Sequence, residues 1–148
     1  VGRGGVRCLA VAVELKRDIY GRPESDSVEK VNLTEAFASF DEHWSPRLAG
    51  ELNGQAVKLA KAGGEFVWHR HEDADELFLV FSGALRIELR DSADVTLQEG
   101  EFVIVPRGVE HRPVAEDEAE ILLFEPPETR NTGNVETEQT RTGRETVD

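Results

Sequence analysis

Two histidines separated by a single residue, His69 and His71, carry the strongest chemical signal in the chain. They stand in a run that reads Gly-x5-His-x-His-x4-Glu-x6-Gly, in which the acid is Glu76. A second run, Gly-x5-Pro-x-Gly-x2-His, ends at His111. Side chains alternate along an extended strand, so His69 and His71 are expected to project to the same face. Glu76 and His111 can then complete a set of three nitrogens and one oxygen around one divalent ion.

These four residues predict a metal site. A coordinating imidazole must be neutral and a coordinating carboxylate must be ionised. Such a donor set suits Fe, Mn, Ni, Cu or Zn, and the residues do not choose among these metals. Four protein ligands leave room for water or substrate on an ion that accepts five or six. We assign no catalytic residue.

The remaining candidates near the motifs have simpler explanations. His43 lies beside Trp44, outside the spacing pattern, and is interpreted as a surface or structural histidine. The acidic residues Glu72, Asp73 and Asp75 are interpreted as a solvated turn between strands. We therefore predict no direct ligand among them.

Short apolar segments separated by turn residues fill the chain from about residue 55 to residue 125. Closely spaced strands with such punctuation predict an all-β sandwich or barrel. The candidate strands are 56–61, 65–71, 76–82, 84–90, 94–98, 101–105, 109–115 and 119–125.

Some of these strands are apolar on both faces, namely 77–81, 102–105 and 121–124. The barrel interior covers one face, so something else must cover the other. A short helix after Asn32, a helix N-cap residue with Glu35 three positions later, is one candidate cover. A second subunit is the other, and we expect a homodimer.

Composition excludes several classes of partner. The formal net charge of −13 disfavours nucleic acid and anionic membrane, because both require basic residues. The single cysteine, Cys8, cannot form an intrachain disulfide. The apolar stretch 8–13 is too short for a secretion signal, and no run reaches the length of a membrane span. We expect a cytoplasmic protein that binds a small molecule.

Three regions are predicted along the chain. Residues 1–28 are expected to form an N-terminal extension, and residues 29–126 a single barrel domain that includes the short helix. Residues 127–148 are polar and rich in threonine, and they are expected to form a loosely held C-terminal tail.

Both histidine-containing runs resemble the two signature motifs of the cupin superfamily, and the match holds at every ligand position. Residues 50–125 resemble the small single-domain bacterial cupins, some of which are labelled mannose-6-phosphate isomerase-like. The resemblance implies a double-stranded β-helix, or jelly-roll barrel, with the metal inside and His69, His71, Glu76 and His111 as ligands. The second motif commonly ends in Asn, where this chain has Ala115.

Cupins host many activities, so the fold does not select a reaction. We expect an enzyme whose ion acts on a small oxygen-rich molecule, by Lewis-acid chemistry as in an isomerase or by oxygen activation as in a dioxygenase. Val67, Phe78 and Val80 are expected to line its pocket. A non-catalytic sensor of a small ligand is the alternative, and an inert scaffold ranks third.

Overall fold

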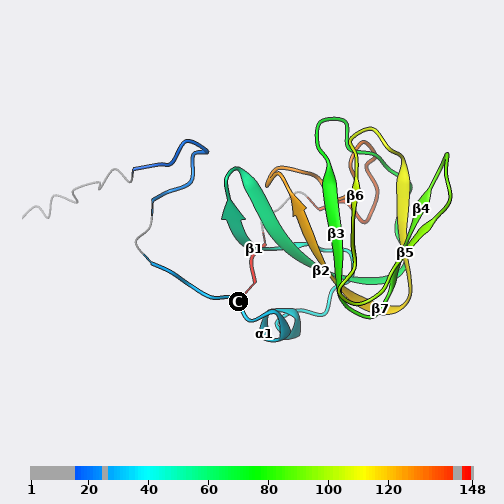
Figure 1. Ribbon diagram of the computed structural model, residues 1–148, viewed down its shortest axis with the longest axis horizontal. Coiled ribbons are helices and arrows are strands. Elements are labelled where there is room, and N and C mark those ends of the chain that lie inside the picture. Colours follow the sequence, from blue (N-terminus) through cyan, green and yellow to red (C-terminus); the bar gives the residue numbers. More distant parts are fainter. Residues whose placement is uncertain (1–15, 25–26, 142–144, 148) are drawn as a thin grey trace, which may run out of the picture.

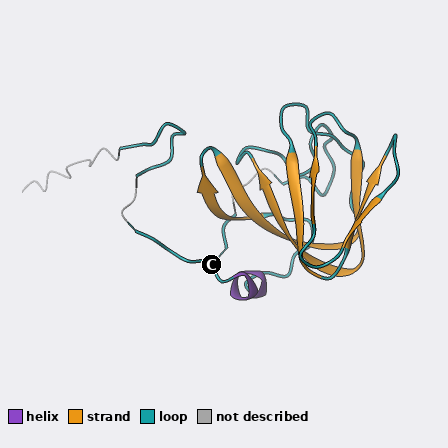
Figure 2. Cartoon of the chain, in the orientation of Figure 1, coloured by secondary structure: helices purple, strands orange, loops and turns teal. Residues whose placement is uncertain are grey.

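The computed structural model describes residues 16–24, 27–141 and 145–147. The described chain forms an antiparallel β-barrel with one short helix against its outer wall (Figures 1 and 2). The predicted all-β barrel with a short N-terminal helix is therefore confirmed. The elements are α1 (Leu33–Ala38), β1 (Arg47–Leu52), β2 (Gln55–Glu65), β3 (Glu76–Ser82), β4 (Leu85–Leu89), β5 (Val95–Leu97), β6 (Phe102–Val105) and β7 (His111–Glu125).

Strand β7 connects the two halves of the barrel. It pairs with β2 along one edge, while its other edge pairs first with β4 and then with β3. Leu122 of β7, for example, lies opposite Leu59 of β2 on one side and Leu79 of β3 on the other. Strand β6 extends the sheet beyond β3, and β5 extends it beyond β4.

Apolar side chains pack on both sides of this sheet. Phe78, Val80 and Ile121 are buried in the barrel interior, whereas Phe37 of α1 is buried against the outer surface. Phe37 stacks on Phe81 with ring centroids 5.5 Å apart. Full burial of such a side chain contributes about 1.5–3 kcal/mol. The helix is therefore a cover within the chain for strands that are apolar on both faces.

The start of α1 follows the predicted capping pattern. The Asn32 side chain accepts a hydrogen bond from the backbone N–H of Glu35 at 3.0 Å. This bond satisfies one of the N–H groups that a helix leaves without an internal partner at its first turn. The helix then runs only to Ala38, so it covers part of the outer surface and leaves the face of β6 open.

The observed strands differ from the predicted strands in three places. Residues 66–71 form an extended segment outside the ladders, joined to them by an isolated bridge at His69. The segments 109–115 and 119–125 belong to one continuous strand, β7. Strand β1 was not predicted, and its pairing with β2 shifts register between Leu48 and Gly50.

The loose packing predicted for the C-terminal tail is wrong for residues 127–141, which pack against the barrel. Thr132 is fully buried. The Asn131 side chain donates to the carbonyls of Trp44 at 3.1 Å and Gln139 at 2.8 Å. Polar residues here satisfy one another and nearby backbone groups, which composition alone does not reveal. The domain boundaries themselves stay predictions.

The described residues contain no helix that is long and apolar enough to cross a membrane. Of the predicted N-terminal extension, residues 16–24 and 27–28 are described. Cys8 and the apolar stretch 8–13 lie outside the described residues.

Candidate metal centre

The four predicted ligands come from three places in the chain. His69 and His71 lie on the extended segment before β3, Glu76 begins β3, and His111 begins β7. The backbones of His69 and His111 are joined by two hydrogen bonds, N–H to O of 3.0 and 2.9 Å, one in each direction. This bridge brings the two motifs together although about forty residues separate them.

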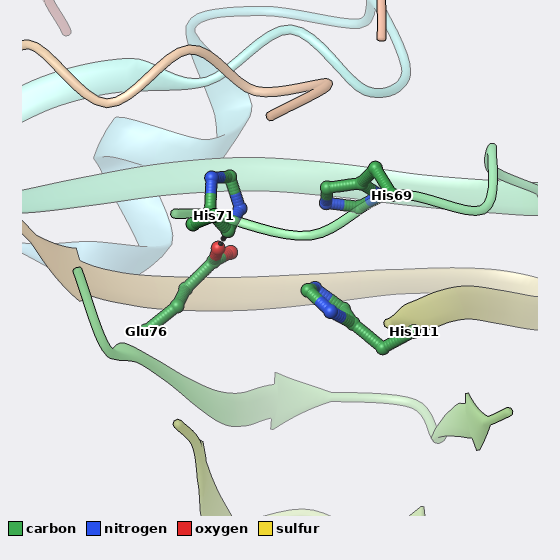
Figure 3. A group of neighbouring side chains, drawn as sticks. All are labelled: His69, His71, Glu76 and His111. Carbon is green, nitrogen blue, oxygen red and sulfur yellow. Dashed lines mark ion pairs between the residues drawn. The ribbon is translucent and has the colours of Figure 1, made fainter. Parts of the chain in front are cut away.

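The four side chains converge inside the barrel (Figure 3). One potential ligand atom from each residue can be chosen so that all four lie within 4.8 Å of one another. Each residue is at most 7% exposed. The ring centroids of His69 and His111 are 4.3 Å apart, and those of His69 and His71 are 5.0 Å apart. This buried group has the residue types and spacing to hold a metal ion.

Several of the converging atoms have no hydrogen-bond partner among the described residues. They are Nε2 of His71, Nε2 of His111 and Oε2 of Glu76. His71 Nε2 and Glu76 Oε2 are only 2.5 Å apart, but their directions do not make a hydrogen bond. Buried polar atoms are almost always hydrogen-bonded, so a close group of such atoms without hydrogen bonds has the arrangement expected of ligands to a cation.

Backbone carbonyls orient two of the rings. His69 Nδ1 lies 2.8 Å from the carbonyl of Val67, and His111 Nδ1 lies 2.9 Å from that of Val109. A carbonyl only accepts, so each Nδ1 carries the hydrogen and each Nε2 keeps its lone pair. Metal-binding histidines are oriented by the same kind of contact.

Burial favours the neutral forms of the three imidazoles and of the Glu76 carboxyl group. It lowers the pKa of His69 to about 3 and of His111 to about 4, with a smaller contribution from neighbouring histidines, and it also lowers the pKa of His71. Burial raises the pKa of Glu76 to about 7, although a hydrogen bond with Glu125 and the charge of Lys58 oppose the rise. The neutral histidines can therefore bind a cation directly, whereas the protonated fraction of Glu76 must first lose its proton.

A second buried acid, Glu125, adjoins the group and was not singled out from the sequence. Its Oε1 accepts a hydrogen bond from Lys58 Nζ at 3.0 Å. Burial and the neighbouring Glu76 raise the pKa of Glu125, and Lys58 limits that rise. Glu125 ends an apolar strand, so its sequence position carries no sign of this contact.

Aromatic side chains surround the group. Phe66 meets the His69 ring edge-on with centroids 5.4 Å apart and stacks on Trp44 at 4.8 Å. Phe78 lines the interior cavity as predicted, whereas Phe66 lines it in place of the predicted Val67. Strand parity fails here because residues 66–71 do not form a regular strand. Val80 is fully buried in the interior core but does not border this cavity.

The residues interpreted as non-ligands lie outside the group. His43 is partly exposed and pairs with Glu118 at 2.7 Å. The acidic turn is exposed, and its Asp75 accepts a hydrogen bond from the backbone N–H of Arg107 at 2.9 Å. These positions agree with the structural roles expected of them.

Comparison with known proteins places the chain in a family. Residues 56–125 match the family model described as Cupin domain. A cupin-2 domain containing protein from Shewanella frigidimarina NCIMB 400 is 48% identical, with a TM-score of 0.63 over 65% of this chain and 93% of that one. Protein NMB1881 from Neisseria meningitidis is 31% identical, with a TM-score of 0.62 over 66% of this chain and 99% of that one.

Two further matches are weaker, one in the share of the chain that it covers and the other in sequence identity. The uncharacterized protein YdbB of Bacillus subtilis (strain 168) is 40% identical over 62 residues, which are 42% of this chain and 55% of that protein. The chain thus matches about half the length of that curated relative. Hydroquinone 1,2-dioxygenase from Sphingomonas sp. TTNP3 shares the fold, with a TM-score of 0.56 over 77% of this chain and 89% of that one, at 17% identity. The motifs, the barrel and the two longer matches agree: the chain belongs to the cupin family.

Proposed function

We propose that this cupin holds one divalent transition metal through His69, His71, Glu76 and His111, and uses it to act on a small oxygen-rich molecule. The observation that carries the proposal is a set of buried Nε2 and Oε2 atoms that have no hydrogen-bond partner among the described residues and lie close together. Three neutral imidazoles and one carboxylate suit Fe, Mn, Ni, Cu or Zn. When bound, such an ion supplies Lewis-acid chemistry or, if it is redox-active, activation of dioxygen.

The chain's own groups prepare the site for this role. The carbonyls of Val67 and Val109 fix the hydrogen of His69 and His111 on Nδ1 and direct Nε2 inward. Phe66 and Phe78 make edge-on ring contacts with His69 and His111, respectively. Burial raises the pKa of Glu76 to about 7, so the protonated fraction of this group releases its proton when a cation enters.

The shape of the interior limits where a substrate can bind. The cavity beside His69 and Glu76 has a volume of only about 30 Å³, which is room for about one water molecule. A larger cavity of about 370 Å³ lies next to it, and both are lined by Pro46 and Asn131. Lys58, in the larger cavity, contacts Glu125, in the smaller one. We infer that a substrate approaches the ion from the larger cavity.

A non-catalytic ligand-binding role is the second candidate. A drug-sized ligand needs a cavity of about 300–1,000 Å³. The cavity of about 370 Å³ meets this need, whereas the cavity at the candidate ligands, with about 30 Å³, does not. A ligand in the larger cavity would therefore lie apart from the ion. In that case the ion would fix the protein's shape, and the larger cavity would bind the ligand without turnover.

A homodimer is also part of the proposal. Ile104 and Phe102 on β6 are 52% and 58% exposed. They lie opposite Leu77 and Leu79 of β3, and these pair in turn with apolar residues of β7. The result is an apolar outer face that α1 covers only in part, which is the kind of surface a second copy buries. The cytoplasmic location and the lack of a nucleic-acid partner stay predictions from sequence.

Metal content tests the central proposal. Protein purified without a histidine tag is expected to contain about one equivalent of a transition metal, and His111→Ala is expected to lose most of it. His43→Ala is the matched control and is expected to keep it, because His43 pairs with Glu118 outside the group. Elemental analysis gives the readout. Equal trace content in the wild type and His111→Ala would remove the basis for the proposal.

Proton release tests the roles of the individual ligands. At pH 6 His69 and His111 are already neutral and Glu76 is mostly protonated, so metal binding is expected to release about one proton from Glu76. The release falls as the pH rises through the pKa of Glu76, and it is largely absent in Glu76→Gln. Calorimetry in buffers of different ionisation enthalpy measures it. A release of two or three protons at pH 6 would show that the histidines are charged in the metal-free protein.

Turnover distinguishes the enzyme from the binding protein. For an enzyme, consumption of oxygen or isomerisation of a small hydroxyacid or sugar is expected to require added metal and to disappear in His111→Ala. Binding of the same compound without turnover, unchanged in His111→Ala, would instead support the second candidate.

The dimer is tested at β6. Ile104→Asp places a charge on the apolar face and is expected to give a monomer by light scattering during gel filtration. Leu52→Asp changes an apolar residue that is 45% exposed at the end of β1, and it is expected to leave a dimer intact. A wild-type protein that is monomeric at tens of micromolar would contradict this part of the proposal.

A further inference from the structure

Residues 130–135, which we name the C-terminal clamp, lie directly against the segment that carries His69 and His71. The backbone N–H of Asn134 donates to the carbonyl of Arg70 at 3.0 Å. The backbone N–H of Arg70 donates in return to Oδ1 of Asn134 at 2.9 Å. Arg70 stands between the two histidines, so both of its backbone polar groups are held by a single residue of the clamp.

Gly133 brings the clamp unusually close to the site. Its φ of +53° lies in the left-handed region. A Cβ added there would lie 2.2 Å from the carbonyl oxygen of Arg70 and 3.1 Å from Cδ2 of His69. There is therefore no room for a side chain at position 133, and the backbone of the clamp packs directly beside the His69 ring.

The clamp is fixed by bonds of its own. Arg130 donates from Nε to the carbonyl of Gly133 and from Nη2 to that of Val135, both at 3.0 Å. Thr132, fully buried, donates from Oγ1 to the carbonyl of Val135 at 2.7 Å. Because these bonds fix the clamp, its hydrogen bonds to Arg70 also restrict the position of the Arg70 backbone.

Other contacts complete the support of the histidine segment. His69 exchanges two backbone hydrogen bonds with His111, and the carbonyl of His71 accepts from the N–H of Gly108 at 2.8 Å. Residues 69–71 lie outside the regular ladders, so these contacts replace strand pairing. The two bonds to Arg70 are made by Asn134, which lies after the family match at residues 56–125.

We propose that the clamp positions His69 and His71 for metal binding, with Asn134 as the positioning residue. The inference rests on the proposed metal site. If the clamp only stabilised the fold, loss of its contact with Arg70 would lower the free energy of unfolding and leave the coordination of the metal unchanged. If it positions the histidines, its loss changes the affinity and the coordination geometry together.

Titration of metal-free protein with Co²⁺, whose visible spectrum reports ligand geometry, tests the proposal. Asn134→Ala removes the acceptor for the Arg70 N–H. Asn134 is exposed, so the variant is expected to fold. Loss of groups that orient metal ligands typically costs about 10–100-fold in affinity. We expect a loss in that range together with a changed spectrum.

Two matched variants isolate the hydrogen bond. Asn134→Asp keeps an oxygen that can accept from Arg70, and it is expected to restore the wild-type spectrum and affinity. Glu136→Ala changes an exposed neighbour just beyond the clamp and is expected to change neither. Gly133→Ala, which drives a Cβ into Arg70, is expected to weaken Co²⁺ binding at least as much as Asn134→Ala.

The outcomes separate the two proposals. Wild-type protein that binds no Co²⁺ would overturn the proposed metal site itself. Wild-type binding that is equalled by Asn134→Ala, in affinity and spectrum, would overturn the clamp and leave the metal site intact. Equal weakening by Asn134→Ala and Asn134→Asp would also overturn it, because the acceptor oxygen would then be irrelevant.

Discussion

The two backbone hydrogen bonds between His69 and His111 are the constraint on which the site depends. They fix the distance between the motifs, and with it the distance between the rings, before any cation is present. The arrangement has a cost, because each buried polar atom without a partner destabilises a fold by about 1–3 kcal/mol. His71, Glu76 and His111 each contribute such an atom. The rest of the barrel must offset that cost, and a bound cation would remove it.

Apolar packing on both sides of the sheet supplies the stability that offsets this cost. Ala60 of β2 faces the interior core, while the adjacent Leu59 packs under α1. Strand β7, which begins at His111, continues the same pattern through Ile121 inside and Leu122 outside. Because the site is anchored on this doubly covered strand, side chains that are far from the ligands still hold His111 in place.

Sequence reasoning identified the four converging residues from their spacing, although one of its premises was wrong. Residues 66–71 lie outside the ladders apart from the isolated bridge at His69, yet the side chains of His69 and His71 still reach the same group. The same irregularity places Phe66 in the interior, where strict alternation predicted Val67. Glu125 and the packed residues 127–141 could not be found from sequence, since their roles depend on contacts with residues far away in the chain.

The family match includes the candidate ligands but not all of the residues that enclose them. All four candidate ligands fall within residues 56–125, the part that matches the cupin domain. Trp44 and Asn131, which help enclose the small cavity beside them, fall outside it. Gly133, against the His69 ring, does so as well. Residues that flank the family match therefore help to set the volume of this cavity and to support the segment that carries His69 and His71.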